Sequence, residues 1–189
     1  AKDMMLFLAG RFGLDGAQYQ AVEFAGEAIA ALPMQERMTL ANMTAEIGAQ
    51  TGLIAPDEVT LAYLHSAGVG EVEIDGWQTD REAPLRERHD FDASSFVPQI
   101  AAPHSPANAR PASDFAGTRV DVAYIGACTG AKLEDLRMAA QVLKGRRAAS
   151  GVRLQVAPAS AKDQETARTE GTLAALLDAG AELLPNACG

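Results

Sequence analysis

Residues 120–130 read Val-Asp-Val-Ala-Tyr-Ile-Gly-Ala-Cys-Thr-Gly, and this stretch decides the fold of the C-terminal third of the chain. Its first half is a short apolar run that predicts a strand at 120–125, which Gly126 ends. Beyond the turn, apolar residues recur from 133 to 143 at the spacing of one helix face. Strand, glycine turn and helix form the first half of a βαβ unit, whose turn commonly carries the functional residues. Here that turn carries Cys128.

The rest of the C-terminal third extends the same pattern. A strand is predicted at 152–156, a helix from an N-cap at Ser160 to about residue 179 with a break at Gly171, and a strand at 181–184. In a right-handed βαβαβ series the strands are parallel, so all strand-to-helix turns open on the same edge of the sheet. Cys128, Ser160 and Cys188 follow the first, second and third strands. The only two cysteines of the chain are therefore expected on one rim of a Rossmann-like α/β sheet.

The N-terminal part also mixes helices and strands. The spacing of apolar residues and the positions of Gly and Pro predict helices at 2–9, 33–52 and from about 57 to before Gly68, strands at 20–24 and 71–74, and extended chain at 91–100. Residues 102–111 are rich in proline and lack periodicity, which predicts an inter-domain linker over about 102–115. We therefore expect an α/β domain at 1–115 and the start of a second, truncated domain at 116–189. The chain has no initiator Met and stops within a turn, so it is expected to be a piece of a longer protein.

The composition of the chain argues for a globular protein and against nucleic-acid-binding and membrane-spanning proteins. The 189 residues are 48% hydrophobic and 22% charged, which is ordinary for a globular protein. The net charge of −9 opposes nucleic-acid binding, which needs a basic surface. No apolar run is long enough to span a membrane, and two cysteines suit a reducing compartment, so a cytoplasmic protein is expected.

A polar pair stands out in the predicted helix at 33–52. Asn42 and Glu46 share a stripe with small and apolar residues at positions 38, 45 and 49. On spacing alone, such a pair is more often a solvated surface pair than a catalytic one. Likewise, a cysteine in a strand-rich core is most often a small buried hydrophobe.

Several segments together resemble the aconitase family. Residues 125–136, Ile-Gly-Ala-Cys-Thr-Gly-Ala-Lys-Leu-Glu-Asp-Leu, are similar to its first cluster-cysteine segment, I-G-[ST]-C-T-N followed by E-D-[LM]. Asn186-Ala-Cys-Gly189 is similar to the start of its second segment, C-x-x-C. Residues 40–49, Leu-Ala-Asn-Met-Thr-Ala-Glu-Ile-Gly-Ala, resemble its C-N-M-x-x-E-x-G-A helix, and 22–26 resemble V-E-[FY]-x-G. The matches keep the family order over nearly the whole chain, and 52–58 favour the 3-isopropylmalate dehydratase and homoaconitase large-subunit branch.

This resemblance implies a fold, a cofactor and an activity. The fold would be three-layer α/β/α, with 1–115 as the second domain of the family and 116–189 as the start of its third. Cys128 and Cys188 would bind a [4Fe–4S] cluster beside Thr129, with a third cysteine beyond Gly189. Asn42 would hydrogen-bond substrate or iron-bound water, and Glu46 would transfer protons there. A small 2-hydroxy acid would be dehydrated and rehydrated, and a swivelling domain would come from a separate small subunit.

Two positions depart from the family pattern, and other functions stay open. Gly130 stands where the family has Asn, and Ala41 stands where it usually has a cysteine that is not a cluster ligand. The resemblance implies a 3-isopropylmalate dehydratase first, with homoaconitase or aconitase as alternatives. A cluster-free regulatory protein on the same fold is an alternative, as is a nucleotide-binding module, although the G-x-G-x-x-G order is missing.

Overall fold

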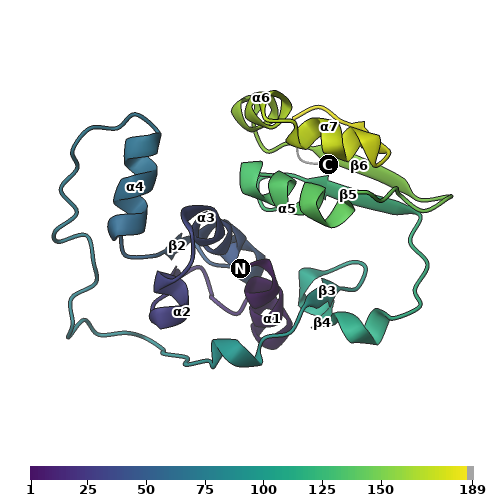
Figure 1. Ribbon diagram of the computed structural model, residues 1–189. Helices are drawn as coiled ribbons and strands as arrows, with labels where there is room; N and C mark the ends of the chain where they lie inside the picture. Colours follow the sequence, from purple (N-terminus) through teal and green to yellow (C-terminus); the bar gives the residue numbers. More distant parts are fainter. Residues whose placement is uncertain (187–189) are drawn as a thin grey trace. The chain divides into compact units, whose positions relative to one another are not determined.

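The computed structural model describes residues 1–186 and divides into two compact units, Ala1–Ala116 and a second that begins at Gly117. Each unit has a hydrophobic core of its own. Figure 1 shows the order of the helices and strands along the chain.

The second unit has the predicted βαβαβ order. Its elements are β5 (Val122–Gly126), α5 (Leu133–Leu143), β6 (Arg153–Ala157), α6 (Ala161–Thr169), α7 (Thr172–Asp178) and β7 (Ala181–Leu183). All three strands are parallel, in the order β5-β6-β7. Gly171 separates α6 from α7 in the left-handed conformation, at φ +90°. The predicted α/β class and parallel sheet are therefore confirmed.

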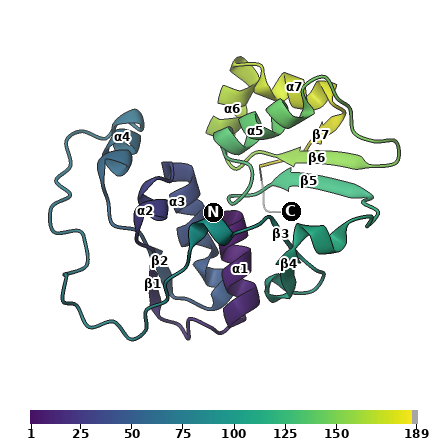
Figure 2. The same cartoon turned by 60° about the horizontal axis from the view of Figure 1, so that its bottom comes forward.

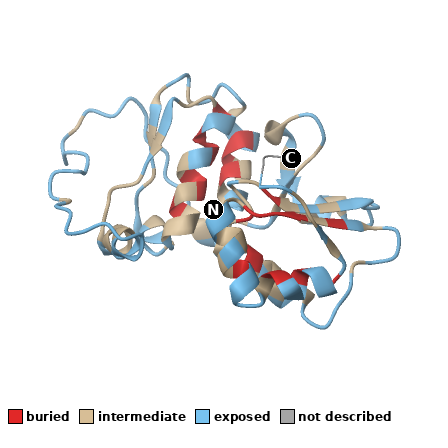
Figure 3. Ribbon diagram, turned by 90° about the horizontal axis from the view of Figure 1, so that it is seen from above, coloured by how far each residue is buried: buried red, intermediate tan, exposed pale blue. Residues whose placement is uncertain are grey.

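The helices of this unit cover one face of the sheet. Both crossovers lead in the same direction across the sheet, and right-handed crossovers then place their helices on the same side. Figure 2 shows α5, α6 and α7 together on that side of β5 and β6. Leu136 from α5, Val156 from β6 and Leu176 from α7 are fully buried between the two layers. Figure 3 colours the buried parts of the chain red.

The opposite face of this sheet is more open. Val122 and Tyr124 alternate with the core-facing residues of β5, and their side chains are 45% and 40% exposed. Beside them, Gln155 of β6 donates a hydrogen bond from Nε2 to Oε2 of Glu182 on β7, at 3.1 Å. Over the described residues, the unit thus contains two of the three expected layers.

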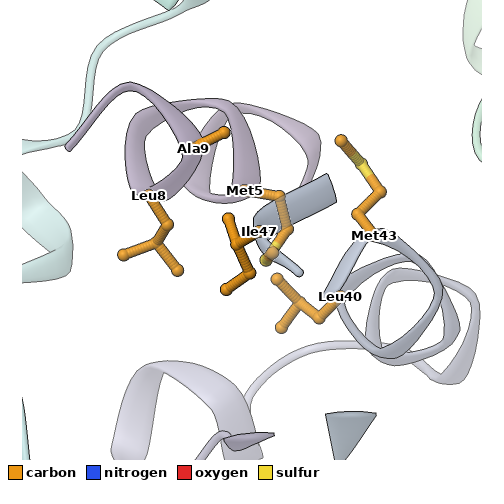
Figure 4. Close-up of a cluster of buried hydrophobic side chains, with 6 residues drawn as sticks. All are labelled: Met5, Leu8, Ala9, Leu40, Met43 and Ile47. Atoms are coloured by element: carbon orange, nitrogen blue, oxygen red, sulfur yellow. The ribbon is translucent and has the colours of Figure 1, made fainter. Parts of the chain in front are cut away.

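The first unit combines helices with two small sheets. Its elements are α1 (Lys2–Phe12), β1 (Ala21–Glu23), α2 (Glu27–Ala30), α3 (Met34–Met43), the 3₁₀ helix η1 (Thr44–Ile47), β2 (Thr51–Leu53), α4 (Glu58–Ser66), η2 (Ala93–Ser95), β3 (Gln99–Ala101), η3 (Pro106–Asn108), β4 (Ala109–Pro111) and η4 (Ala112–Phe115). Strands β1 and β2 are parallel, and β3 and β4 are antiparallel. Its core joins α1 to the α3–η1 segment, as Figure 4 shows: Met5, Leu8, Ala9, Leu40, Met43 and Ile47.

The predicted helix at 33–52 is wrong in its second half. The α-helix ends at Met43, a 3₁₀ turn follows, and Gly48 ends that turn in the left-handed conformation at φ +75°. The chain then forms β2, which pairs with β1. Gly52 of β2 runs so close to α3 that a Cβ on it would lie 2.8 Å from Cα of Ala41. The residues predicted to form the last turns of this helix therefore form η1 and strand β2 instead, and β2 packs closely on α3.

The segment predicted as a linker, at about 102–115, has short regular elements in the structure. This segment contains β4 and the 3₁₀ turns η3 and η4, and its strand pairs with β3 in an antiparallel hairpin. The hairpin packs on α1, where Gly10 leaves room for the carbonyl of Ala109. Gly10 accordingly lies inside α1 and does not end it. Prolines here shape short 3₁₀ turns and a strand edge, which sequence periodicity does not reveal.

The segment at 67–92 has neither helix nor strand, so the strand predicted at 71–74 is not formed. An aromatic cluster joins the C-terminal end of this segment to α1. Phe7 and Phe96 are in edge contact, with 4.9 Å between their ring centres, and the cluster consists of Phe7, Phe12, His89, Phe91 and Phe96. Aromatic pairs of this kind stabilise a contact beyond the area they bury.

A buried arginine, which the sequence analysis did not single out, organises the connection between α2, α3 and α4. Arg37 is 3% exposed and forms a two-pronged ion pair with Asp57, at 2.7 and 2.8 Å. Its guanidinium also donates to the carbonyls of Ala30 and Leu32. Asp57 in turn accepts the backbone N–H of Val59 and caps α4. The hydrogen bond from Arg37, the largest cause, holds the pKa of Asp57 below its usual value.

Candidate active site

The turn after β5 exposes Cys128. Ala127 adopts φ +65°, unusual for a residue with a side chain, and its carbonyl accepts the N–H groups of Gly130 and Ala131 at 3.3 and 3.1 Å. Cys128 itself is exposed, whereas Thr129 and Gly130 are half-buried in the same turn. A thiol in this position can reach a ligand outside the sheet, unlike the buried cysteine that a core position would give.

Tyr124 explains why a glycine ends β5. A Cβ on Gly126 would lie 2.0 Å from Cζ and 2.2 Å from Oη of Tyr124. The Tyr124 ring therefore lies directly over the Gly126 backbone, on the open face of the sheet. A larger residue at position 126 would displace the ring and alter the path of the chain into the Cys128 turn.

Hydrogen bonds join the ends of all three strands into one rim. The N–H of Ala159, after β6, donates to the carbonyl of Ala131, after β5, at 2.8 Å. Nδ2 of Asn186, after β7, donates to the carbonyl of Pro158 at 3.0 Å. Asn186 itself is thus anchored at the rim, two positions before Cys188 in the sequence. The predicted ligand Cys188 itself lies outside the described residues.

Ser160 has the structural role predicted for it. Its Oγ accepts the N–H of Asp163 at 3.0 Å, which caps α6, and donates to Oδ2 of Asp163 at 2.6 Å. The other carboxylate oxygen of Asp163 accepts the N–H of Leu133 at 3.3 Å. This pair therefore connects the beginnings of α5 and α6, on either side of the rim.

Lys132 is a residue of the site that the sequence analysis missed. Its Nζ donates to the carbonyl of Cys128 at 2.9 Å and lies 3.7 Å from Oδ2 of Asp135. The side chains of Lys132 and Asp135 are only 14% and 15% exposed. The sequence did contain a signal for this contact. Directly after the cysteine turn, Lys132 is followed three residues later by Asp135.

Asn42 and Glu46 lie in the first unit. Asn42 is on α3 and Glu46 on η1, and both residues are exposed. They are four positions apart, but the change from α-helix to 3₁₀ helix falls between them, so the single continuous helix stripe is not formed. Cys128 and Thr129 share a turn of the second unit.

The described residues of the rim fit a thiolate-bound cluster. Cys128 is exposed in a turn whose backbone is fixed by hydrogen bonds, a lysine side chain lies beside it, and the Asn186 segment is held at the same edge. Within residues 1–186, no group of three or more His, Cys, Asp or Glu side chains could hold a metal ion.

Comparison with known proteins agrees with the motifs at this rim. The model of the aconitase family (aconitate hydratase) matches residues 1–118 and 109–189, which together span the whole chain. The chain belongs to the aconitase family. The family fold confirms the α/β architecture expected from the quoted segments.

Relatives within the aconitase family carry more specific names. The chain is 40% identical over 188 residues to the 3-isopropylmalate dehydratase large subunit of Desulfitobacterium hafniense and 42% identical over 188 residues to that of Moorella thermoacetica. It is 42% identical over 189 residues to a probable methanogen homoaconitase large subunit of Methanosarcina mazei. Each match covers 100% of this chain but 44%, 44% and 47% of the relative. The chain therefore spans less than half the length of these aconitase-family relatives.

None of the helices within residues 1–186 has the length and apolar character needed to cross a membrane.

Proposed function

We propose that this chain contributes to an iron–sulfur hydro-lyase that isomerises a 2-hydroxy di- or tricarboxylic acid by removing water and adding it back. The observation that carries the proposal is the rim of the second unit. There, an exposed Cys128 and the Asn186 segment that leads into Cys188 share one sheet edge. The names of the relatives support 3-isopropylmalate as the substrate.

In this proposal, Cys128 and Cys188 bind a [4Fe–4S] cluster and Thr129 lies against it. The cluster supplies a Lewis-acidic iron that makes the hydroxyl group of the substrate a better leaving group. The protein holds Cys128 in place through the backbone turn at Ala127 and the contact from Lys132. The hydrogen bonds across the rim fix the strand ends from which the ligands project.

Asn42 and Glu46 would act on the substrate. The amide of Asn42 can donate hydrogen bonds to a carboxylate or to water, and the carboxylate of Glu46 can accept a proton and return it. Their exposure on α3 and η1 leaves both groups accessible to a ligand. Dehydration breaks a C–H bond, whose proton is taken by a base, and a C–O bond. Glu46 would donate a proton to the departing hydroxyl group so that it leaves as water, and would take a proton back from water on rehydration.

The partner proposed for this chain is a separate small subunit. The relatives are named large subunits, and a large subunit implies a smaller companion that supplies further substrate-binding groups. The relative named for homoaconitase supports homoaconitate as the alternative substrate.

Anaerobic iron–sulfide reconstitution of the complete product of the gene tests the proposal. We expect about four irons per protein and a visible absorption band, both lost in Cys128→Ala. With the small subunit added, Glu46→Gln should lower kcat for 3-isopropylmalate by 10²–10⁴-fold while the cluster is retained. Glu58→Gln, which alters another exposed glutamate of the first unit, is the matched control and should retain activity.

Two outcomes would contradict this. Protein that binds no iron under these conditions would favour the cluster-free regulatory function. Protein that binds iron equally well with and without the Cys128 thiol would overturn the ligand assignment but leave the family fold intact.

A further inference from the structure

Lys132 occupies a position where local preferences oppose a lysine. It is the N-cap residue of α5, where Ser, Thr, Asp or Asn are preferred because their side chains accept the free N–H groups of the first turn. An ammonium group also lies unfavourably at the N-terminus of a helix, which is the positive end of its dipole. Residues that break local rules without an evident local gain often serve a function.

The contacts of the Lys132 side chain connect it to the Cys128 turn. The Lys132 side chain is 14% exposed, which is unusual for lysine, and its ammonium group donates a 2.9 Å hydrogen bond to the carbonyl of Cys128. Asp135 offsets part of the charge at 3.7 Å, and its Oδ2 also accepts the N–H of Lys132 at 3.0 Å. Asp135 thus satisfies the N–H of Lys132, and Asp163 accepts the N–H of Leu133, the first residue of α5. Other side chains therefore supply acceptors at this helix end, and the Lys132 side chain contacts the cysteine turn.

We propose that Lys132 is a positioning residue for the Cys128 ligand: its ammonium group fixes the carbonyl of Cys128 and supplies positive charge to the anionic group bound by the thiolate. This inference rests on the proposed function, because it takes Cys128 as a cluster ligand. The reduction potential of an iron–sulfur cluster depends on the net charge and hydrogen bonding around it. A cation close to one ligand favours the reduced, more negative cluster and so raises the potential.

The first test probes the charge at Cys128 without any cluster. Alkylation by iodoacetamide, which is neutral, is compared with alkylation by iodoacetate, which is an anion, and the Cys128 peptide is quantified by mass spectrometry. In both reactions the thiolate sulfur forms a bond to carbon as iodide leaves, so the ratio of rates reports the local electrostatic attraction. Lys132→Met should lower the iodoacetate-to-iodoacetamide ratio about twofold to threefold, and Lys132→Arg should restore it. An unchanged ratio in Lys132→Met would overturn the proposed charge effect.

The second test uses reconstituted protein. Lys132→Met should lower the reduction potential of the cluster by the equivalent of about a tenfold change in the one-electron equilibrium, ~59 mV. It should also speed the loss of iron to a chelator, and Lys132→Arg should recover both properties. Lys144→Met is the matched control, because it removes the same charge at the exposed opposite end of α5, and it should change neither.

The results separate this inference from the proposed function. If wild-type protein binds no iron, the cluster function fails, while the alkylation ratio still decides whether Lys132 acts on Cys128. If wild-type protein binds a cluster and Lys132→Met has the same potential and chelator resistance, the Lys132 side chain only packs against the Cys128 turn. Circular dichroism of Lys132→Met identifies a variant that has failed to fold, and Lys132→Gln then takes its place.

Discussion

At the scale of single residues, the buried guanidinium of Arg37 donates hydrogen bonds to Asp57 and to the carbonyls of Ala30 and Leu32. Breaking such a pair leaves its remaining partners unsatisfied, so Arg37→Met should cost about 3 kcal/mol of unfolding free energy. Asp57 is itself 40% exposed and can regain water, which places the loss at the lower end of the range for buried pairs. Urea denaturation followed by circular dichroism measures it.

The exposed ion pair of Arg88 and Asp90 provides the control for this prediction. Both side chains are more than 70% exposed, so Arg88→Met should change stability by less than about 0.5 kcal/mol. Equal losses in the two variants would show that burial of Arg37 has no special energetic role.

Some of the other features of single residues could be predicted from the sequence, and others could not. The turn at Cys128, the break at Gly171 and the Ser160 cap were predictable, because glycine marks the two turns and serine is a preferred N-cap residue. Arg37 and Lys132 were not, because a charged residue is ordinarily expected on the surface and only the tertiary structure shows its acceptors.

At the scale of helices and strands, an ion pair joins α5 to the end of α6. Arg137 of α5 donates to Glu170, and Thr172 donates to the same carboxylate. The hydrogen bond from Arg137, the largest cause, lowers the pKa of Glu170 to about 2. A carboxyl group with a lowered pKa in the folded state adds stability above its unfolded pKa, and this stability is lost as the pH falls through the folded value.

The stabilising effect of Glu170 should therefore be complete above about pH 4.5 and disappear towards pH 2. Glu170→Gln should be less stable than wild type at pH 7, and the two urea midpoints should converge as the pH is lowered through this range. Glu165→Gln removes a more exposed pair with Arg168 and should have little effect at any pH. A Glu170→Gln difference that is constant with pH would contradict the ion-pair explanation.

The end of the α3–η1 segment depends on a glycine in a left-handed conformation. In Gly48→Ala, the new Cβ would meet the carbonyl oxygen of Leu14 at 2.5 Å, in addition to the strain of φ +75°. We expect a loss of about 3 kcal/mol, combining backbone strain with overpacking. Thermal and urea denaturation measure it.

Gly68→Ala separates the two causes. Gly68 has a similar φ of +83° but no atom within 4 Å of the added Cβ, so only the backbone strain of about 1 kcal/mol applies. If Gly48→Ala and Gly68→Ala lower the free energy of unfolding equally, the contact with Leu14 does not contribute.

This region also shows why the sequence predicted elements better in the second unit than in the first. Helix α5 and its flanking strands have regular apolar spacing over 120–157, and the structure follows it closely. In the first unit, the end of α3, the β2 strand and the β3–β4 hairpin depend on contacts between segments distant in sequence. Strands of three residues carry too little periodicity to be recognised without those contacts.

At the scale of the whole molecule, the family was predictable because several short motifs keep their order over nearly the whole chain. The site was predictable only in part. Residue types and spacing indicated Cys128 and the shared rim, whereas the hydrogen bonds that build the rim come from backbone groups and from Asn186, which no periodicity distinguishes.

The Asn186 anchor has a consequence for how the site would capture metal. Two ligands on a freely moving chain find the same ion only at an entropic cost, and that cost falls when the chain already keeps them near each other. Nδ2 of Asn186 is held by the carbonyls of Pro158 and Ser160, so protein atoms alone tie the chain to the rim as far as Asn186. If Cys188, two positions later, is the second ligand as proposed, this tether would raise its effective concentration around Cys128 and lower the entropic cost of forming the chelate.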